Sequence, residues 1–102
     1  MEEKDFFYIE LFELYKSLLT DKQKELFGSH YLYDLSLSEI AETEGTTRQS
    51  VYDAVKKVKN KLEDYEKSLK LKEKYDALKK IASELKTKDE KLSESILELI
   101  GK

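Results

Sequence analysis

Residues 36–57 read SLSEIAETEGTTRQSVYDAVKK and carry the signals of two short helices joined by a tight turn. Ser36 and Glu39 have the spacing of a capping box, in which each side chain satisfies a backbone amide of the other residue at a helix start. Gly45 stands where a helix end favours a left-handed residue. Thr47 is a suitable N-cap for a second helix. This stretch therefore predicts a helix, a turn and a longer helix.

Three residues at fixed spacing distinguish this pair of predicted helices from two arbitrary helices. Ala41 is small enough for the helices to approach where they cross, and Gly45 permits positive φ in the turn. Val51 closes the core between the helices from the second one, with Ile40 and Val55 around it. This combination predicts a helix-turn-helix. A chance helical hairpin is the alternative.

The composition of the whole chain favours helices. Its 102 residues include no proline and three glycines, and they are rich in lysine, glutamate and leucine. Few helix breakers among strong helix formers predict an all-α protein. We expect about five or six helices, with additional C-terminal helices after the helix-turn-helix core. The first four are expected over about residues 5–19, from the capping box Thr20–Gln23 onward, over 37–44 and over 48–68.

The apolar pattern changes phase after Leu69, which predicts two regions. A slip of this kind indicates a kink or a break near residues 68–72, of which we prefer the break. We expect a helix-turn-helix domain over 1–69, with its recognition helix at about 48–68. A C-terminal helical extension over 70–102 then packs on the rest or dimerises, and Thr87 caps its last helix.

Two single residues in the second helix carry narrower expectations. Gly28 lies inside the helical pattern, where it would weaken an exposed helix but could allow a close helix crossing. His30 is the only histidine, and the chain has no cysteine. A lone histidine of this kind is better explained as a packed or capping side chain than as a metal ligand.

Charge is distributed unevenly along the chain. The net charge is −3, but residues 1–47 carry four lysines against eleven acids, whereas residues 48–80 carry eleven basic residues against six acids. A local basic face matters more to a polyanion than the total charge does. This pattern favours nucleic-acid binding, although a solvated lysine-rich helix face would give the same pattern.

In a helix-turn-helix, the first residues of the second helix reach base edges in the major groove. Arg48 could bond guanine and Gln49 adenine, and Thr46 and Thr47 could bind phosphate. Lysines further along the helix could neutralise the backbone. The candidate nucleic-acid-binding residues are Thr46, Thr47, Arg48, Gln49, Tyr52, Lys56, Lys57 and Lys59.

Asp53 argues against simple groove binding because it lies in the same exposed row. Phosphates repel a carboxylate unless it accepts from cytosine or pairs with a neighbour. Lys56 and Lys57 lie three and four residues on, so an intrahelical ion pair is available. The alternative is that the whole row is a solvated helix face.

Three segments resemble the YlxM family of small bacterial helix-turn-helix proteins: FELYKSLLTDKQ, YLYDLSLSEIAETEG and TRQSVYDAVKKVKNKLEDYEKSLKL. The resemblance covers about residues 10–75, and its second and third segments are similar to region 4 of bacterial sigma factors. It implies a sigma-region-4-like core. It also implies a role in regulating or assisting the signal recognition particle pathway, beside whose genes members are commonly encoded.

The family pattern places its turn glycine on Gly45, its capping hydroxyl on Thr47 and its Arg-Gln pair on Arg48 and Gln49. Its Val-Tyr-Asp falls on residues 51–53, so the acid in the exposed row belongs to the pattern. The sequence departs from the family at Thr46, where an apolar residue usually packs under the turn. The resemblance therefore implies a looser turn here.

Two functions remain in view. The first is a nucleic-acid-binding regulatory protein, with DNA as a possible target. The alternative is a protein-interaction module that binds the NTPase or the RNA of the signal recognition particle without sequence-specific DNA binding. An enzyme is not expected, because the chain lacks cysteine and a phosphate-cradling glycine loop and has one histidine. For the same reasons no catalytic residue, metal or cofactor is expected.

Location and assembly can also be predicted. The longest apolar run, residues 6–9, is far shorter than the ~20 residues of a membrane span, so a cytoplasmic protein is expected. The apolar stripes on residues 6–19 and 71–85 exceed what one small core needs, which predicts a homodimer. Two recognition helices in such a dimer would lie ~34 Å apart on DNA.

Overall fold

The computed structural model describes residues 3–101, which fold into six α-helices and one 3₁₀ helix without a strand. The predicted all-α fold is therefore confirmed. Among the described residues, no helix is both long and apolar enough to cross a membrane. The chain divides between Leu69 and Lys70 into two units. The elements are α1 (Glu3–Tyr15), η1 (Lys16–Leu18), α2 (Asp21–Tyr31), α3 (Leu37–Glu44), α4 (Arg48–Leu69), α5 (Leu71–Leu85) and α6 (Glu90–Ile100).

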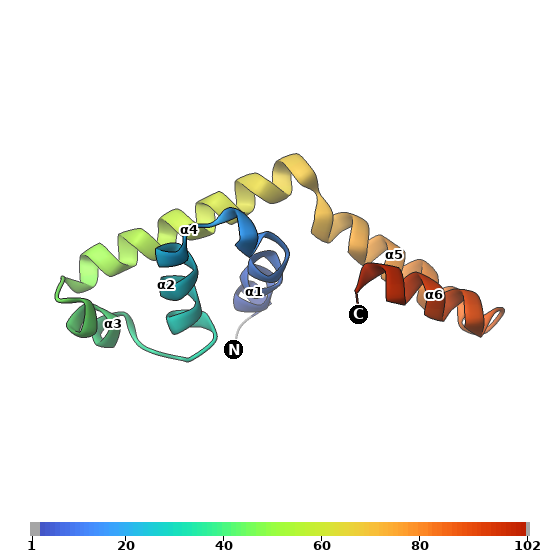
Figure 1. Ribbon diagram of the computed structural model, residues 1–102, viewed down its shortest axis with the longest axis horizontal. Helices are drawn as coiled ribbons and strands as arrows, with labels where there is room; N and C mark the ends of the chain where they lie inside the picture. Colours follow the sequence, from blue (N-terminus) through green and yellow to red (C-terminus); the bar gives the residue numbers. More distant parts are fainter. Residues whose placement is uncertain (1–2, 102) are drawn as a thin grey trace. The chain divides into compact units, whose positions relative to one another are not determined.

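The first unit is built around α4, and α1, α2 and α3 all contact it (Figure 1). Phe27 of α2 lies at the centre of the core, with its ring stacked on Phe12 at 4.7 Å and on Tyr31 at 4.4 Å between ring centroids. The valines and the leucine of α4 recur at steps of three and four, so they lie on one apolar face of the helix. This face is turned toward the core of the first unit. Its buried members are Val51, Val55, Val58 and Leu62.

Hydrogen bonds of tyrosine hydroxyls connect α1 and the segment after it to the second half of α4. Tyr15 donates to the Glu66 carboxylate at 2.6 Å, and Tyr8 donates to Glu63. Tyr65 donates in the other direction, to the carbonyl of Leu18 at 3.2 Å. Buried rings with hydrogen-bonded hydroxyls both fill the core and fix the register of one helix on another.

Local capping signals begin α2 and α3 as the sequence predicts. In α2 the Gln23 amide donates to the Thr20 hydroxyl at 3.1 Å, and the Thr20 amide donates to the Gln23 side chain at 3.0 Å. Ser36 and Glu39 form the same reciprocal pair at the start of α3. The first predicted helix is shorter than expected, because α1 ends at Tyr15 and continues only as the 3₁₀ turn.

The expectation that Gly28 serves a close helix crossing is wrong. A Cβ atom at this position would meet the Leu32 side chain of the following turn at 4.0 Å, and no neighbouring helix comes closer. His30 accords with its expected capping role, because its Nδ1 lies 2.8 Å from the carbonyl oxygen of Leu35, just after α2. Its ring also meets the Tyr31 ring edge-on.

The second unit is a helical hairpin of α5 and α6, which lie side by side (Figure 1). Lys70 has φ 54°, so the backbone turns left-handed between α4 and α5, and the predicted break near 68–72 is present. Small residues allow the two helices to approach: Ser93 of α6 is 2% exposed and donates to the carbonyl of Ala82 at 2.6 Å.

Thr87 does not cap the last helix. Its hydroxyl donates back to the carbonyl of Glu84 at 3.3 Å, at the end of α5. Asp89 is the N-cap instead, and its carboxylate accepts from the Leu92 amide at 3.0 Å. A carboxylate directly before the helix start satisfies the exposed amides better than a hydroxyl still held in the preceding turn.

Candidate nucleic-acid interface

The turn between α3 and α4 is closed by backbone hydrogen bonds around Gly45. Gly45 has φ 70° and ψ 35°, a left-handed conformation that glycine adopts without steric penalty. The Thr46 amide donates to the carbonyl of Ala41 at 2.9 Å, and the Gly45 amide donates to Glu42 at 3.4 Å. These two bonds form a Schellman motif. The turn is regular although Thr46 is exposed, so the looser turn implied by this residue is not found.

Thr47 caps α4 as predicted. Its hydroxyl oxygen accepts from the Ser50 amide at 3.0 Å, and the hydroxyl donates to the Ser50 side chain at 2.9 Å. The carbonyl of Thr47 accepts from the Val51 amide. Because the one O–H donor of Thr47 is used within the cap, its side chain supports the start of the helix more directly than it offers a phosphate contact.

The predicted outward row is present on the first three turns of α4. Arg48, Gln49, Tyr52, Asp53 and Lys56 are all exposed, whereas the valines of the same helix face the core. Arg48, Tyr52 and Lys56 follow one another at intervals of four, so they form a single stripe along the helix. We call these three residues the outer stripe.

Asp53 is paired, but not with the lysines that the sequence suggested. Its Oδ1 accepts a hydrogen bond from Gln49 Nε2 at 3.0 Å, one helical turn earlier. One of the two N–H donors that Gln49 would present to adenine is therefore used within the helix. This pair is formed in place of the ion pair with Lys56 or Lys57 that the spacing made available.

The other two candidate lysines lie on different sides of α4, because successive helix positions are about 100° apart. Lys57 lies beside a cavity of about 190 Å³ with an apolar floor of Leu26, Val51 and Ala54. Thr46 lines the same cavity, and Lys22 and Glu44 form an ion pair at its rim. Lys57 is exposed there.

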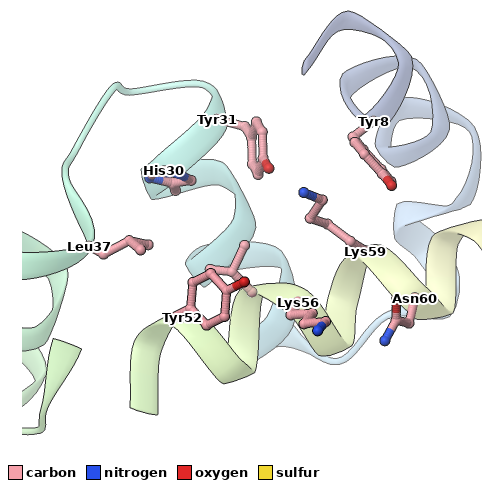
Figure 2. Close-up of a pocket in the computed structure, with 9 residues that line it drawn as sticks. Tyr8, His30, Tyr31, Leu37, Tyr52, Lys56, Lys59 and Asn60 are labelled. Atoms are coloured by element: carbon pink, nitrogen blue, oxygen red, sulfur yellow. The ribbon is translucent and has the colours of Figure 1, made fainter. Parts of the chain in front are cut away.

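Lys59 is half-buried and faces the first two helices (Figure 2). Its ammonium nitrogen lies 4.5 Å from the centroid of the Tyr8 ring and 6.0 Å from that of Tyr31. Such distances favour a cation–π interaction. Lys59 therefore lines a second cavity, of about 240 Å³, rather than the outer stripe. Other residues around this cavity are Tyr8, His30, Tyr31, Leu37, Tyr52, Val55, Lys56 and Asn60.

Several residues of this second cavity were not among the sequence candidates. Tyr8 and Tyr31 belong to the apolar stripes of α1 and α2, so the pattern explained them as core residues. Asn60 follows Lys56 at an interval of four and could have been added to the candidate face from spacing alone. Among residues 3–101, no group of three or more histidine, aspartate or glutamate side chains could hold a metal ion.

Sequence comparisons agree with this geometry. Residues 2–100 match a family model described as "UPF0122: Putative helix-turn-helix protein, YlxM / p13 like". A UPF0122 protein of Caldanaerobacter subterraneus subsp. tengcongensis is 43% identical over 96 residues, covering 94% of this chain and 76% of that protein. One from Anoxybacillus flavithermus is 43% identical over 96 residues, covering 87% of both chains. One from Bacillus cereus is 39% identical over 93 residues, covering 88% of this chain and 84% of the relative.

Proposed function

The chain belongs to the UPF0122 family of YlxM/p13-like helix-turn-helix proteins, and we propose that it is a nucleic-acid-binding regulatory protein acting in the signal recognition particle pathway. The observation that carries the binding proposal is the outer stripe: Arg48, Tyr52 and Lys56 project from α4 directly after a regular helix-turn-helix turn. The pathway rests on the resemblance to the YlxM family.

We propose that binding is dominated by phosphate contacts. Arg48, Lys56 and Lys57 are exposed cations on the first three turns of α4 and would neutralise backbone charge. Gln49 is held by Asp53, and the Asp53 carboxylate would be repelled by phosphates. Base reading by this helix is therefore expected to be weak, and affinity for duplexes should fall steeply with salt.

Fluorescence anisotropy with labelled duplex DNA and duplex RNA, titrated at several salt concentrations, tests this proposal. Replacing both Lys56 and Lys57 by glutamate should weaken binding and lower the slope of log affinity against log salt by about 2 or more. Lys88→Glu together with Lys91→Glu makes two charge reversals outside α4 and is the matched control. Wild-type protein that binds neither duplex at micromolar concentration and low salt would refute the proposal.

A second candidate function is a protein-interaction module that binds the NTPase or the RNA of the signal recognition particle. The cavity beside Lys57 favours it, because an apolar floor of Leu26, Val51 and Ala54 suits a side chain of a protein partner. Pull-downs with purified particle components would test it. If the variant with Lys56→Glu and Lys57→Glu loses duplex binding but keeps the NTPase, the partner contact lies away from both the outer stripe and the cavity beside Lys57.

We also propose that the protein is a homodimer and that the α5–α6 hairpin forms the interface. A hairpin of this size cannot bury enough apolar surface by itself. It leaves Ile81 49% exposed, Leu92 48% exposed and Leu99 89% exposed. Two such hairpins could bury these side chains in a four-helix arrangement. Light scattering should give a dimer mass that Ile81→Lys reduces to the monomer mass.

We also propose that the protein is cytoplasmic and that it is not an enzyme. A chain with no cysteine fits a reducing compartment, which supports a cytoplasmic location. One histidine, held by the Leu35 carbonyl, offers little for proton transfer, which supports a binding protein over an enzyme.

A further inference from the structure

The cavity between α1, α2 and α4 combines aromatic rings with lysines in a way that the duplex-binding proposal does not use (Figure 2). It measures about 240 Å³ and opens beside Tyr52 and Lys56, two members of the outer stripe. A strand lying along the stripe would therefore pass the mouth of this cavity. We call it the tyrosine pocket.

The tyrosine pocket has two cationic side chains in its wall. Lys56 and Lys59 line it, and none of its lining residues is a carboxylate. Within the described part of the chain, neither lysine makes an ion pair with an acidic side chain. Figure 2 shows Lys59 extending from α4 toward the space between Tyr8 and Tyr31, where the rings hold its ammonium group. An anionic group entering the pocket would meet both cations.

The same pocket offers planar surfaces and polar edges. Tyr52 is 45% exposed, so much of its ring is open to a ligand. Tyr31 is fixed from behind by stacking on Phe27, which keeps its position on the pocket wall. The Asn60 amide can both donate and accept hydrogen bonds at the edge of a planar ligand. Aromatic rings beside lysines are the usual means by which proteins bind unpaired bases.

We propose that the tyrosine pocket receives one unstacked nucleotide of a single-stranded segment, with its base against Tyr52 and its phosphate near Lys56 and Lys59. This inference rests on the proposed nucleic-acid binding and adds the class of ligand. The pocket volume of about 240 Å³ is below the range usual for drug-sized ligands, so the pocket has room for one base and not for a stacked base pair. A regular duplex would reach the outer stripe but could not fill the pocket.

Anisotropy with two labelled probes of equal length tests the proposal: a single-stranded oligouridine and a fully paired RNA duplex. Tyr52→Ala should weaken the oligouridine about tenfold and the duplex much less, because base–aromatic stacking operates only on the unpaired base. Lys59→Gln should have the same effect, because its ammonium group lies inside the pocket, which the duplex does not fill. Tyr52→Phe keeps the ring and should bind as wild type. Lys57→Gln is the matched control, since it removes one charge outside the pocket and should weaken both probes alike. An oligodeoxythymidine arm distinguishes RNA from DNA.

The outcomes separate this inference from the proposed function. Duplex binding without oligouridine binding would overturn the pocket and leave the duplex proposal standing. Failure of both probes would overturn both. Oligouridine binding that is unchanged in Tyr52→Ala and in Lys59→Gln would also overturn the pocket. A single 5-iodouridine in the probe gives a direct measurement, since irradiation should produce an adduct that mass spectrometry maps to Tyr52 and that Tyr52→Ala abolishes.

Discussion

Replacing Gly45 and Gly28 by alanine adds the same methyl group at two positions and should move the stability of the first unit in opposite directions. Gly45 has φ 70°, and a Cβ atom there would meet no heavy atom within 4 Å. No steric clash adds to the effect, so its size is the left-handed penalty of an L-residue, about 1–2 kcal/mol. Gly45→Ala should therefore lower the free energy of unfolding by that amount.

Gly28 lies inside α2 with right-handed helical geometry, and its added Cβ would lie 4.0 Å from the Leu32 side chain. That distance is ordinary van der Waals contact and requires no movement. Alanine has the higher helix propensity, by about 0.8–1 kcal/mol in an exposed helix interior. Gly28→Ala should therefore raise the free energy of unfolding by up to this amount, so the two variants should differ by about 2–3 kcal/mol.

Urea denaturation followed by tyrosine fluorescence measures this difference, because six of the seven tyrosines precede Leu69 and report on the first unit. In thermal unfolding the same difference corresponds to more than about 8 °C between the two variants. Gly45→Asn is the control, since asparagine tolerates the left-handed region and should fall between wild type and alanine. Gly45→Ala as stable as wild type, or Gly28→Ala clearly less stable, would refute the reasoning.

Three further outcomes follow from hydrogen bonds. Burial, and then the hydrogen bond to Glu63, raise the pKa of Tyr8 to about 12. The free energy of unfolding should therefore fall as pH rises from about 10 to 12. In urea titrations, Tyr8→Phe should show a weaker dependence of this free energy on pH in that range. Hydrogen bonds from the Ser36 backbone amide, and then from its hydroxyl, lower the pKa of Glu39 from 4.5. The free energy of unfolding should therefore fall as pH drops below that value. Urea titrations of Glu39→Gln should lack this dependence on pH. Ser93→Ala removes a buried hydrogen bond and should destabilise the hairpin by about 1 kcal/mol, seen by circular dichroism.

Features that depend on a few neighbouring residues were predictable from the sequence. The boxes at Thr20 and Ser36 and the turn at Gly45 each involve groups within five positions of one another. The hydrogen bonds of these caps form when the helices begin and end at the residues that the sequence pattern predicts. The break at Lys70 was readable for the same reason, since the apolar positions change phase on either side of it.

Features that depend on packing between distant segments were not predictable in this way. The location of Lys59 beside Tyr8 requires the docking of α1 on α4, which spacing along α4 alone does not specify. The close helix crossing expected at Gly28 is wrong because helical spacing does not reveal which neighbour faces a given residue. Thr87 was assigned to the wrong cap because two residues near the start of α6 had suitable side chains, and the carboxylate of Asp89 takes the position.

The Gln49–Asp53 pair bears on how an acidic helix-turn-helix protein could still select a target. It uses the one amide of the outward row suited to adenine and keeps a negative charge between Arg48 and Lys56. If the proposed function is correct, α4 holds a nucleic acid by charge and shape, and such contacts carry little sequence information. Selectivity must then come from another surface. The tyrosine pocket adjoins the outer stripe, and it would favour targets in which a helical segment leads into an unpaired base.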